Sequence, residues 1–184
     1  MTAYEAAIFD FGGVFTTSPV ESFAAFEREY ALPERFLGGV IKRNHHTNAW
    51  ARLERSEISL DEFGDAFAAE SEALGHRVHG HDVLPLLAGQ VRPTMVQAVR
   101  RIQERGLHTA LLTNNVLTTG NDGREWNEMR DVIAMFEVIV ESSRVGVRKP
   151  EPRFYELALA ELDIEPGVAA VLAAPGVNPT PAPA

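Results

Sequence analysis

Short apolar runs separated by amphipathic segments make up most of the chain. One apolar run covers residues 6–11 and is followed by glycines, and similar runs cover residues 108–115, 136–147 and 168–174. Brief continuous apolar runs are typical of strands that are buried on both faces of a parallel sheet. Because helical patterns separate these runs, the sequence predicts an α/β fold built on a parallel sheet.

The segment between the first two predicted strands has a different pattern. Over residues 19–88 the apolar positions recur mainly with helical spacing, and few strand-like runs interrupt them. Within this segment, Ser59 and Glu62 have the spacing of a capping box, which predicts a helix N-terminus. We therefore expect residues 19–88 to form a helical cap that is inserted into a core of residues 1–18 and 89–184.

The rest of the chain adds two predicted helices and a polar loop. Residues 91–106 show helical spacing and end in a glycine, which is a typical residue after a helix C-terminus. Residues 151–163 have an amphipathic helical pattern. The segment with His76, His79 and His81 lacks the further ligand pattern of a metal site, so we expect a polar loop of the cap there.

The charge of the chain limits its partners. Its net charge of −9 at pH 7 opposes binding to a nucleic-acid backbone or an anionic membrane, whereas a locally positive pocket can still bind a small phosphorylated molecule. The chain has no cysteine, which excludes disulfides, thiolate metal sites and a cysteine nucleophile. Since no signal-type or membrane-spanning apolar segment is evident, we expect a cytoplasmic protein. Its oligomeric state stays open, a dimer included.

Candidate functional residues stand at the predicted strand ends. Asp10 ends the first strand, Thr113 and Asn114 end the second, and Lys149 follows the third. In an open parallel sheet, ligands bind beyond the carboxyl ends of the strands. We expect Asp10 to attack an anionic substrate as a nucleophile. Thr113 and Asn114 would bind the substrate oxygens, and Lys149 would offset their charge.

Two glycines follow Asp10 closely. Gly12 and Gly13 allow backbone N–H groups to approach the same substrate oxygens. We therefore expect the turn after the first strand to bind substrate as well.

Three motifs, in this order, resemble those of one known family. They read IFDFGGVFTTSP, LLTNN and SSRVGVRKPEPRFYELAL, with the helical insert between the first two. The chain resembles the haloacid dehalogenase-like hydrolase superfamily, and within it the branch of the N-terminal phosphatase domain of soluble epoxide hydrolases and related acyl-CoA dehydrogenase-associated domains. The resemblance implies a Rossmann-like core, a helical cap that lines the substrate pocket, and hydrolysis through an aspartyl intermediate, usually with magnesium. It assigns Asp10 as the nucleophile, Thr113 as a phosphate-binding hydroxyl and Lys149 as the active-site lysine.

The chain departs from this family pattern in two places. Phosphatases of the superfamily carry a second aspartate two residues after the nucleophile, and Gly12 occupies that position here. The fourth strand of such proteins ends in acids that bind magnesium, and Ala173 and Ala174 stand there instead. Asp10 and a backbone carbonyl near Gly12 would then hold magnesium only weakly, because this ion prefers several hard oxygen ligands. We also expect an incomplete C-terminal part of the core and a low phosphatase activity.

Three functions remain open at this point. The first, which the resemblance favours, is a phosphatase-type hydrolase that acts on a small phosphorylated substrate. The second is a 2-haloacid dehalogenase, which needs neither magnesium nor the second acid, although the serine- and asparagine-rich pattern expected after the fourth strand is missing. The third is a non-catalytic domain that binds anions or regulates a partner.

Overall fold

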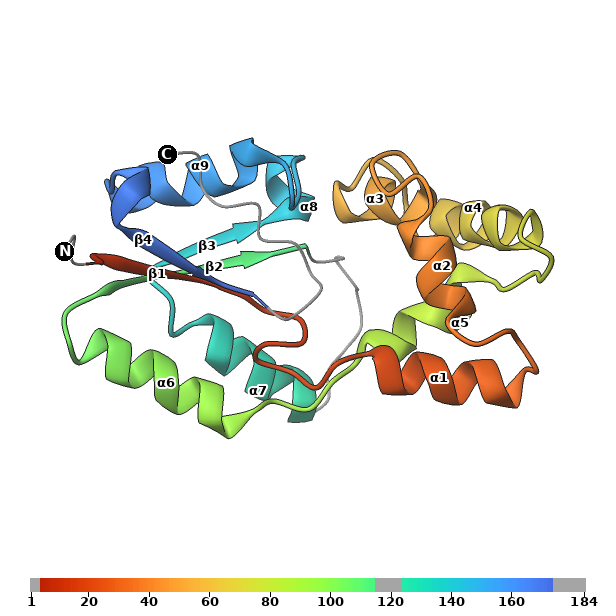
Figure 1. The fold of residues 1–184 in the computed structure, drawn as a ribbon, viewed down its shortest axis with the longest axis horizontal. Coiled ribbons are helices and arrows are strands. Elements are labelled where there is room, and N and C mark those ends of the chain that lie inside the picture. The colour runs from red at the N-terminus through yellow and green to blue at the C-terminus, as the bar shows by residue number, and fades with distance from the viewer. Residues whose placement is uncertain (1–3, 115–123, 174–184) are drawn as a thin grey trace. The chain divides into compact units, whose positions relative to one another are not determined.

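The structure is a computed structural model that describes residues 4–114 and 124–173. The chain divides into two compact units (Figure 1). Unit 1 comprises Met1–Thr17 and Gln90–Ala184, and unit 2 comprises Ser18–Gly89. The second unit is therefore an insertion within the first.

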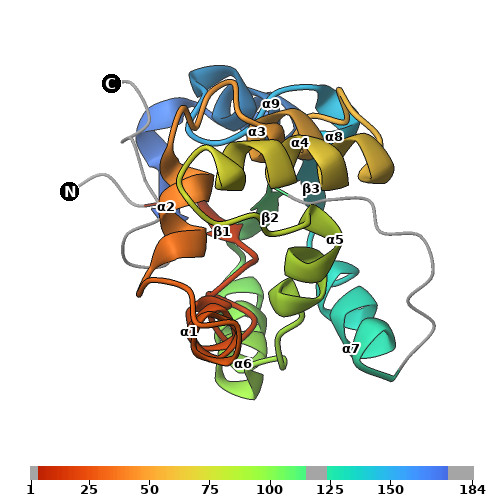
Figure 2. The ribbon, with the colours of Figure 1, turned by 90° about the vertical axis from the view of Figure 1, so that its right-hand side faces the viewer.

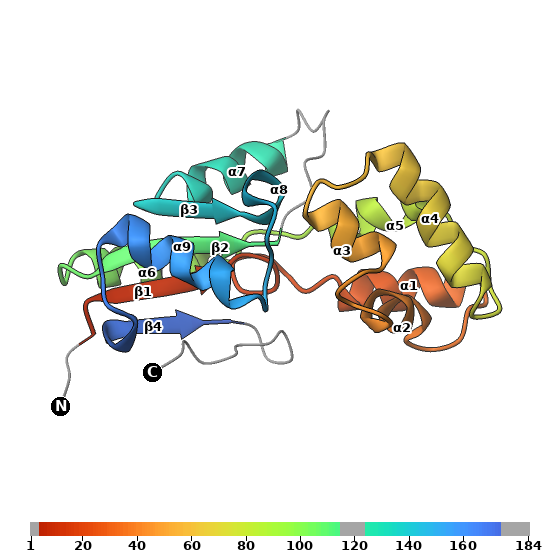
Figure 3. The same cartoon turned by 90° about the horizontal axis from the view of Figure 1, so that it is seen from above.

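Unit 1 contains a four-stranded parallel sheet in the order β3-β2-β1-β4, which Figure 3 shows from above. The strands are β1 (Ala6–Asp10), β2 (His108–Thr113), β3 (Val138–Glu141) and β4 (Ala169–Leu172). Every residue of β1 is buried, as expected for an inner strand that is covered on both faces. The parallel sheet and the helical insert confirm the predicted fold class.

Helices cover both faces of this sheet. In Figure 1, α6 and α7 lie on one face and α9 lies on the other. The helices of unit 1 are α6 (Pro93–Gln103), α7 (Arg124–Ile133), α8 (Ser142–Val145) and α9 (Pro152–Leu162), with a 3₁₀ turn at Pro166–Val168. The sequence pattern does not predict α7. Among the helices that the structure describes, none combines the length and the apolar character needed to cross a membrane.

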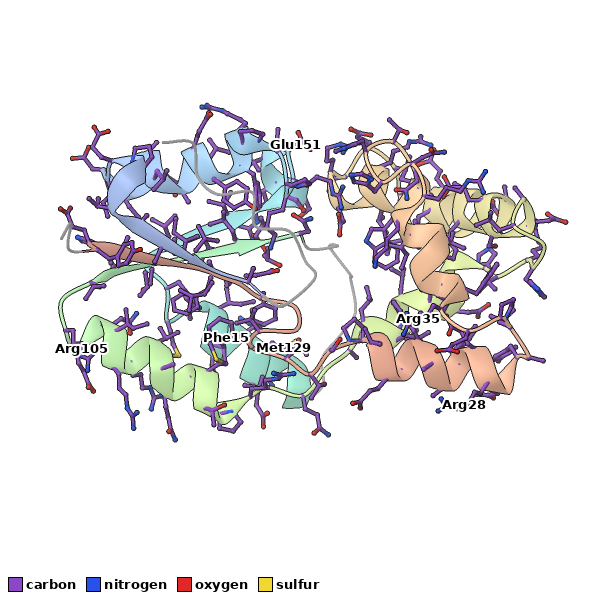
Figure 4. The ribbon with its side chains drawn as sticks, in the orientation of Figure 1. Phe15, Arg28, Arg35, Arg105, Met129 and Glu151 are labelled. Carbon is purple, nitrogen blue, oxygen red and sulfur yellow. The ribbon has the colours of Figure 1, made fainter. Side chains whose placement is uncertain are left out.

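The alternation of side chains along β1 divides the core of unit 1 into two layers. Ile8 packs in the layer beneath α9. Phe9 packs in the opposite layer, where its ring centroid lies 5.5 Å from that of Phe15. Figure 4 labels Phe15, which lies between the sheet and the helices α6 and α7. Because Asp10 is two residues after Ile8, its side chain leaves β1 on the α9 face.

The third predicted strand is shorter than expected. Only Val138–Glu141 is extended, and the following residues form α8 and a turn. Gly146 ends α8 with a φ of +71°, a conformation that residues with a side chain rarely adopt. The helix predicted over residues 91–106 also ends earlier than expected, at Gln103, and Gly106 follows with a φ of +78°.

Unit 2 is built from helices, which Figure 2 shows facing the viewer. They are α1 (Val20–Glu29), α2 (Phe36–Lys42), α3 (Ala49–Glu54), α4 (Leu60–Glu72) and α5 (Gly80–Val83), followed by a 3₁₀ turn at Leu84–Leu87. The predicted capping box is confirmed at the start of α4. Ser59 Oγ accepts from the Glu62 N–H at 3.2 Å, and Glu62 Oε2 accepts from the Ser59 N–H at 2.8 Å.

The segment predicted as a polar loop of the cap is partly helical, because α5 forms within it. α5 begins after His79, whose Nδ1 accepts a hydrogen bond from the His81 N–H at 3.4 Å. Glycines at the contact between α4 and α5 allow these helices to approach each other closely. A Cβ added at Gly80 would lie only 2.6 Å from the ring of Phe63 on α4. This close packing explains a helical turn that the polar composition of the segment does not predict.

Unit 2 contains a buried carboxylate at the start of α2. Glu27, on α1, is only 4% exposed. Its Oε2 accepts from the Arg35 N–H at 2.8 Å, and its Oε1 accepts from the Leu37 N–H at 2.9 Å. The first N–H groups of a helix have no partner within the helix. Glu27 therefore satisfies two backbone donors at the N-terminus of α2 with both of its oxygens.

The two chain segments that connect the units are hydrogen-bonded to each other within unit 1. The Thr17 N–H donates to the Gln90 carbonyl at 3.0 Å, and the Gln90 N–H donates to Thr17 Oγ1 at 3.1 Å. Nearer to the sheet, the Arg92 N–H donates to the Phe15 carbonyl at 2.7 Å. The insert therefore leaves and rejoins unit 1 at adjacent points.

Candidate active site

Asp10 is the last residue of β1 and lies at the carboxyl end of an inner strand. Its side chain is buried, and the residue is 7% exposed. The Phe11 N–H donates to Asp10 Oδ1 at 2.7 Å, and the Lys149 ammonium donates to the same oxygen. Within residues 4–114 and 124–173, no group donates a hydrogen bond to Asp10 Oδ2. The two oxygens of this carboxylate therefore have different environments.

Lys149 is buried beside Asp10, in the segment between α8 and α9. Its Nζ also donates to the carbonyl oxygen of Leu112 at 2.7 Å. Leu112 is the residue of β2 that pairs in register with Asp10, so two adjacent strands meet the ammonium group. Burying a charge is costly unless the charge is paired and hydrogen-bonded. The Asp10 carboxylate and the Lys149 ammonium are each paired with the opposite charge and hydrogen-bonded to it, so each offsets the cost of burying the other.

Asn114 follows β2 and contacts the backbone of Lys149. The Lys149 N–H donates to Asn114 Oδ1 at 2.9 Å, and Asn114 Nδ2 donates to the Lys149 carbonyl at 3.2 Å. The structure therefore brings three of the predicted site residues together: Asp10, Asn114 and Lys149.

Thr113 is not hydrogen-bonded to these three residues. It is the last residue of β2 and is buried, and strand alternation directs its side chain to the face opposite that of Asp10. Among the described residues no hydrogen bond is formed by its hydroxyl, and no buried polar side-chain atom there lacks a partner, so this hydroxyl is itself accessible. An accessible hydroxyl at the strand end is a donor that remains available to a ligand.

The turn after β1 contains the two glycines that are expected to bind substrate oxygens through their backbone N–H groups. The Gly13 N–H donates to Thr16 Oγ1 at 3.2 Å, and Gly13 has a φ of +75°. The Gly13 N–H is therefore hydrogen-bonded within the turn, and its binding to substrate stays a prediction. Gly12 is exposed, and a Cβ placed there would meet no atom within 4 Å. The position where the family resemblance leads us to expect an aspartate therefore has open space around it.

Two residues near the strand ends were not found from the sequence. Tyr155, on α9, is buried, and burial followed by the negative charge of Asp10 raises the pKa of its hydroxyl above the usual value. Glu141 ends β3, pairs in register with Thr113 and forms an ion pair with Arg144. An acid at the end of an apolar strand is the same signal that singled out Asp10. No comparable sequence signal marks Tyr155.

The described residues do not form a magnesium site. Magnesium prefers several hard oxygen ligands. Within the described ranges, no three side chains of the ligand types His, Cys, Asp and Glu are grouped to hold a metal ion. The sequence proposes Asp10 and a backbone carbonyl near Gly12 as the metal ligands. The side chain of Ala173 supplies no ligand, and Ala174 lies outside the described residues.

The fold and the site together define a class of protein: an α/β protein with a helical insert and a buried aspartate–lysine pair at the carboxyl edge of its sheet. The family model of haloacid dehalogenase-like hydrolases matches residues 4–172. The chain belongs to this family, which confirms the resemblance inferred from the three motifs.

Curated relatives support the same assignment. The chain is 32% identical to acyl-CoA dehydrogenase family member 10 of Mus musculus over 182 residues, which covers 96% of this chain and 17% of the relative. It is 30% identical to bifunctional epoxide hydrolase 2 of Sus scrofa, over 89% of this chain and 32% of the relative. The chain therefore spans a third or less of the length of these two proteins. Sesquiterpene phosphatase astK of Aspergillus oryzae is 27% identical, over 88% of this chain and 76% of the relative.

Solved structures share the fold. A family enzyme of Bacteroides thetaiotaomicron, in complex with magnesium and inorganic phosphate, has a TM-score of 0.59 at 16% identity, over 92% of this chain and 84% of that chain. The L-2-haloacid dehalogenase of Xanthobacter autotrophicus, with chloropropionic acid covalently bound, has a TM-score of 0.54 at 18% identity, over 91% of this chain and 69% of that chain. At these identities the likeness concerns the fold alone.

Proposed function

We propose that the chain is a phosphatase-type hydrolase that acts on a small phosphorylated substrate through an aspartyl intermediate. The observation that carries this proposal is the asymmetry of the Asp10 carboxylate. Two donors hold Oδ1, whereas no described residue donates to Oδ2. A carboxylate that is fixed by one oxygen and open at the other is arranged for nucleophilic attack. Among the relatives, one is named as a phosphatase.

The proposed reaction has two steps. Asp10 Oδ2 attacks the phosphorus atom, the Oδ2–P bond forms, and the bond from phosphorus to the leaving oxygen breaks with its electron pair on that oxygen. Water then attacks the phosphorus of the aspartyl phosphate, which releases inorganic phosphate and restores the carboxylate. The Lys149 ammonium offsets the charge of the phosphoryl oxygens, and the Thr113 hydroxyl donates to one of them.

The leaving oxygen has no acid at position 12 to protonate it. General acid catalysis typically contributes about 100- to 10,000-fold. We therefore propose that the chain hydrolyses aryl phosphates, whose leaving groups need no protonation, better than alkyl phosphates. We further propose that unit 2, the residue 19–88 cap of the sequence prediction, shapes substrate choice more than it affects the chemistry at Asp10.

Magnesium has only a minor place in this proposal. A solved family enzyme holds magnesium and phosphate. The described residues of this chain offer one carboxylate oxygen and a backbone carbonyl, which is a poor donor set for the ion. We expect calorimetric titration with MgCl₂ to give weak binding, and the proposed steps do not depend on the ion.

A second candidate function is hydrolytic dehalogenation of a haloacid, and Gly12 is the observation that favours it. In that reaction Asp10 Oδ2 attacks the carbon that bears the halogen. An ester forms, and the halide leaves with the bonding electron pair. Because a halide needs no proton, the missing acid at position 12 does not hinder this step.

A substrate panel tests both candidates. It contains an aryl phosphate, an alkyl phosphate and 2-chloropropionate, each with and without MgCl₂. We expect turnover of the aryl phosphate and its loss in Asp10→Asn, while the exposed control Asp131→Asn on α7 retains it. Halide release without phosphate release would replace the first candidate by the second. Activity that survives Asp10→Asn would exclude the covalent mechanism, and inactivity on the whole panel would favour a non-catalytic anion-binding domain.

A further inference from the structure

We propose that Asn114 is a positioning residue that acts through Lys149 and not a ligand of the substrate. The inference rests on the proposed function, in which Lys149 faces the substrate anion. It starts from a contact that the sequence does not reveal. One side-chain amide binds both backbone polar groups of Lys149, with Lys149 N to Asn114 Oδ1 at 2.9 Å and Asn114 Nδ2 to Lys149 O at 3.2 Å.

This double contact fixes the backbone on both sides of the Lys149 Cα. The N–H before the Cα and the carbonyl after it are bound to the same planar amide, so the two peptide groups that flank Lys149 are held in one orientation. The direction of the Cα–Cβ bond follows from those two peptide groups. A flexible four-carbon side chain reaches a defined position only when its starting direction is defined.

The carboxyl end of β2 therefore holds Lys149 at both ends of its side chain. The Leu112 carbonyl accepts from Nζ at 2.7 Å, and Asn114, two residues later, holds the backbone. The residue before Lys149 is also held, since the Arg148 N–H donates to Glu151 Oε1 at 3.3 Å. Figure 4 labels Glu151, which stands before the first turn of α9. These contacts fix the position from which the Lys149 ammonium donates to Asp10 Oδ1.

The same contacts limit what Asn114 can offer to a substrate. Its carbonyl oxygen is occupied by the Lys149 N–H, and one of its two amide hydrogens is directed at the Lys149 carbonyl. A side-chain amide has one acceptor oxygen and two donor hydrogens. Direct substrate binding would therefore use a single remaining hydrogen, whereas positioning uses both ends of the amide.

The first test observes Lys149 without requiring any activity. The sequence contains two lysines, Lys42 and Lys149, and Lys42 is exposed. Protein labelled with [¹³Cε]-lysine therefore gives two side-chain signals, which Lys149→Arg assigns. In ligand-free protein we expect Asn114→Ala to move the Lys149 signal, because the ammonium then no longer lies in one position beside Asp10. The Lys42 signal serves as an internal reference, far-UV circular dichroism checks that the fold is intact, and Asn127→Ala, at an exposed asparagine on α7, serves as the matched control.

The second test is a double-mutant cycle on the hydrolysis of an aryl phosphate. Misplacement of a catalytic group by about 1 Å costs on the order of 100-fold in rate, so we expect Asn114→Ala to lower kcat by about 100-fold with a smaller change in KM. In a Lys149→Ala background the same substitution should change kcat by no more than about twofold. Asn114→Asp, which keeps the acceptor for the Lys149 N–H, should restore part of the loss.

The two tests separate the possible failures. An unchanged Lys149 signal in ligand-free Asn114→Ala, or an equal loss of kcat in both backgrounds, would overturn the positioning role. A rise in KM alone would assign Asn114 to substrate binding instead. If the parent chain hydrolyses no phosphate ester, the proposed function fails, and the lysine spectrum alone decides whether Asn114 positions Lys149.

Discussion

Asp10 in unit 1 and Glu27 in unit 2 are both buried carboxylates, with 7% and 4% of their surface exposed. Glu27 accepts two backbone N–H groups, one on each oxygen. Asp10 also accepts two donors, but both approach the same oxygen. Burial alone does not distinguish these two acids. They differ in how the donors are distributed over the two oxygens, and this difference supports the proposed role of Asp10.

The two acids also differ in what holds them. Glu27 is held by backbone groups that any sequence of the same conformation would supply, and Arg35 beside it has a φ of +62°. Asp10 accepts one backbone N–H, that of Phe11, and is also held by the side chain of Lys149, whose charge it offsets. Removal of one charge from this pair leaves the other buried without compensation. The following experiments break or sharpen this difference, beginning with the largest expected effect.

Replacement of the buried ammonium should have the largest effect on stability. Lys149→Met leaves the Asp10 carboxylate buried without its partner, and removal of one member of a buried pair typically costs about 3–5 kcal/mol. Urea unfolding at pH 7 measures the loss. Addition of Asp10→Asn in the same chain should recover part of it, because the unpaired charge is then gone. A loss in the double variant as large as in Lys149→Met would contradict the pairing argument.

Addition of a second carboxylate, two residues after Asp10, should raise activity. Gly12→Asp has room for its side chain, and the substituted residue would supply the acid that protonates the leaving oxygen. We expect turnover of an alkyl phosphate to rise by about 100-fold, the lower end of general acid catalysis. Gly12→Asn is the matched control, because it has the same shape without an ionisable group. Equal rates in the two variants would mean that another residue already protonates the leaving group.

Truncation of the structural acid should affect stability and leave the chemistry unchanged. Glu27→Ala removes the partners of two N–H groups at the start of α2, and a buried donor without a partner costs about 1–3 kcal/mol. Glu29→Ala, an exposed acid on the same helix, should change the unfolding free energy very little. Below the unfolding transition, the specific activity of Glu27→Ala should equal that of the parent chain. A selective loss of kcat would give Glu27 a role in the reaction.

The smallest expected effect is on stability at alkaline pH, through Tyr155, whose pKa is raised in part by the charge of Asp10. Because burial and the Asp10 carboxylate raise the pKa of Tyr155 above that of the unfolded chain, its contribution to stability is complete below pH ~10 and is lost as the pH rises further. Urea unfolding between pH 8 and pH 11 should show a decline at the alkaline end that Tyr155→Phe reduces. Tyr30→Phe, at an exposed tyrosine, should leave the decline in place. An identical decline in both variants would show that other groups cause it.

Much of the fold follows from the sequence because each strand is a short apolar run between helical patterns. The same regularity places Asp10 and Lys149 at one edge of the sheet before any coordinates are known. The boundaries fail where apolar residues continue past the strand: Val145 and Val147 extend the apolar pattern after β3, yet the chain turns into α8 and ends that helix at a glycine with positive φ. The spacing of apolar residues along the sequence does not reveal this change from strand to helix.

The contacts within the site are less predictable than the positions of its residues. Asn114 and Lys149 are 35 residues apart in the sequence, and the hydrogen bonds between them depend on how the segment after α8 meets the end of β2. The donor of Gly13 is also taken by Thr16, three residues later, which the glycine pattern does not show. Sequence patterns identify which chemical groups reach the edge of the sheet. They do not show which of these groups bind one another.

The hydrogen bonds between Thr17 and Gln90, at the two ends of the insert, affect how this chain can change over evolutionary time. Because the ends of the insert are held side by side, unit 2 enters the chain of unit 1 as a closed loop, and the free-energy cost of closing a loop depends only weakly on its length. We therefore expect insertions and deletions within unit 2 to leave the pairing of β1 with β2 intact. The sheet and its aspartate–lysine pair can then be retained while the inserted part diverges.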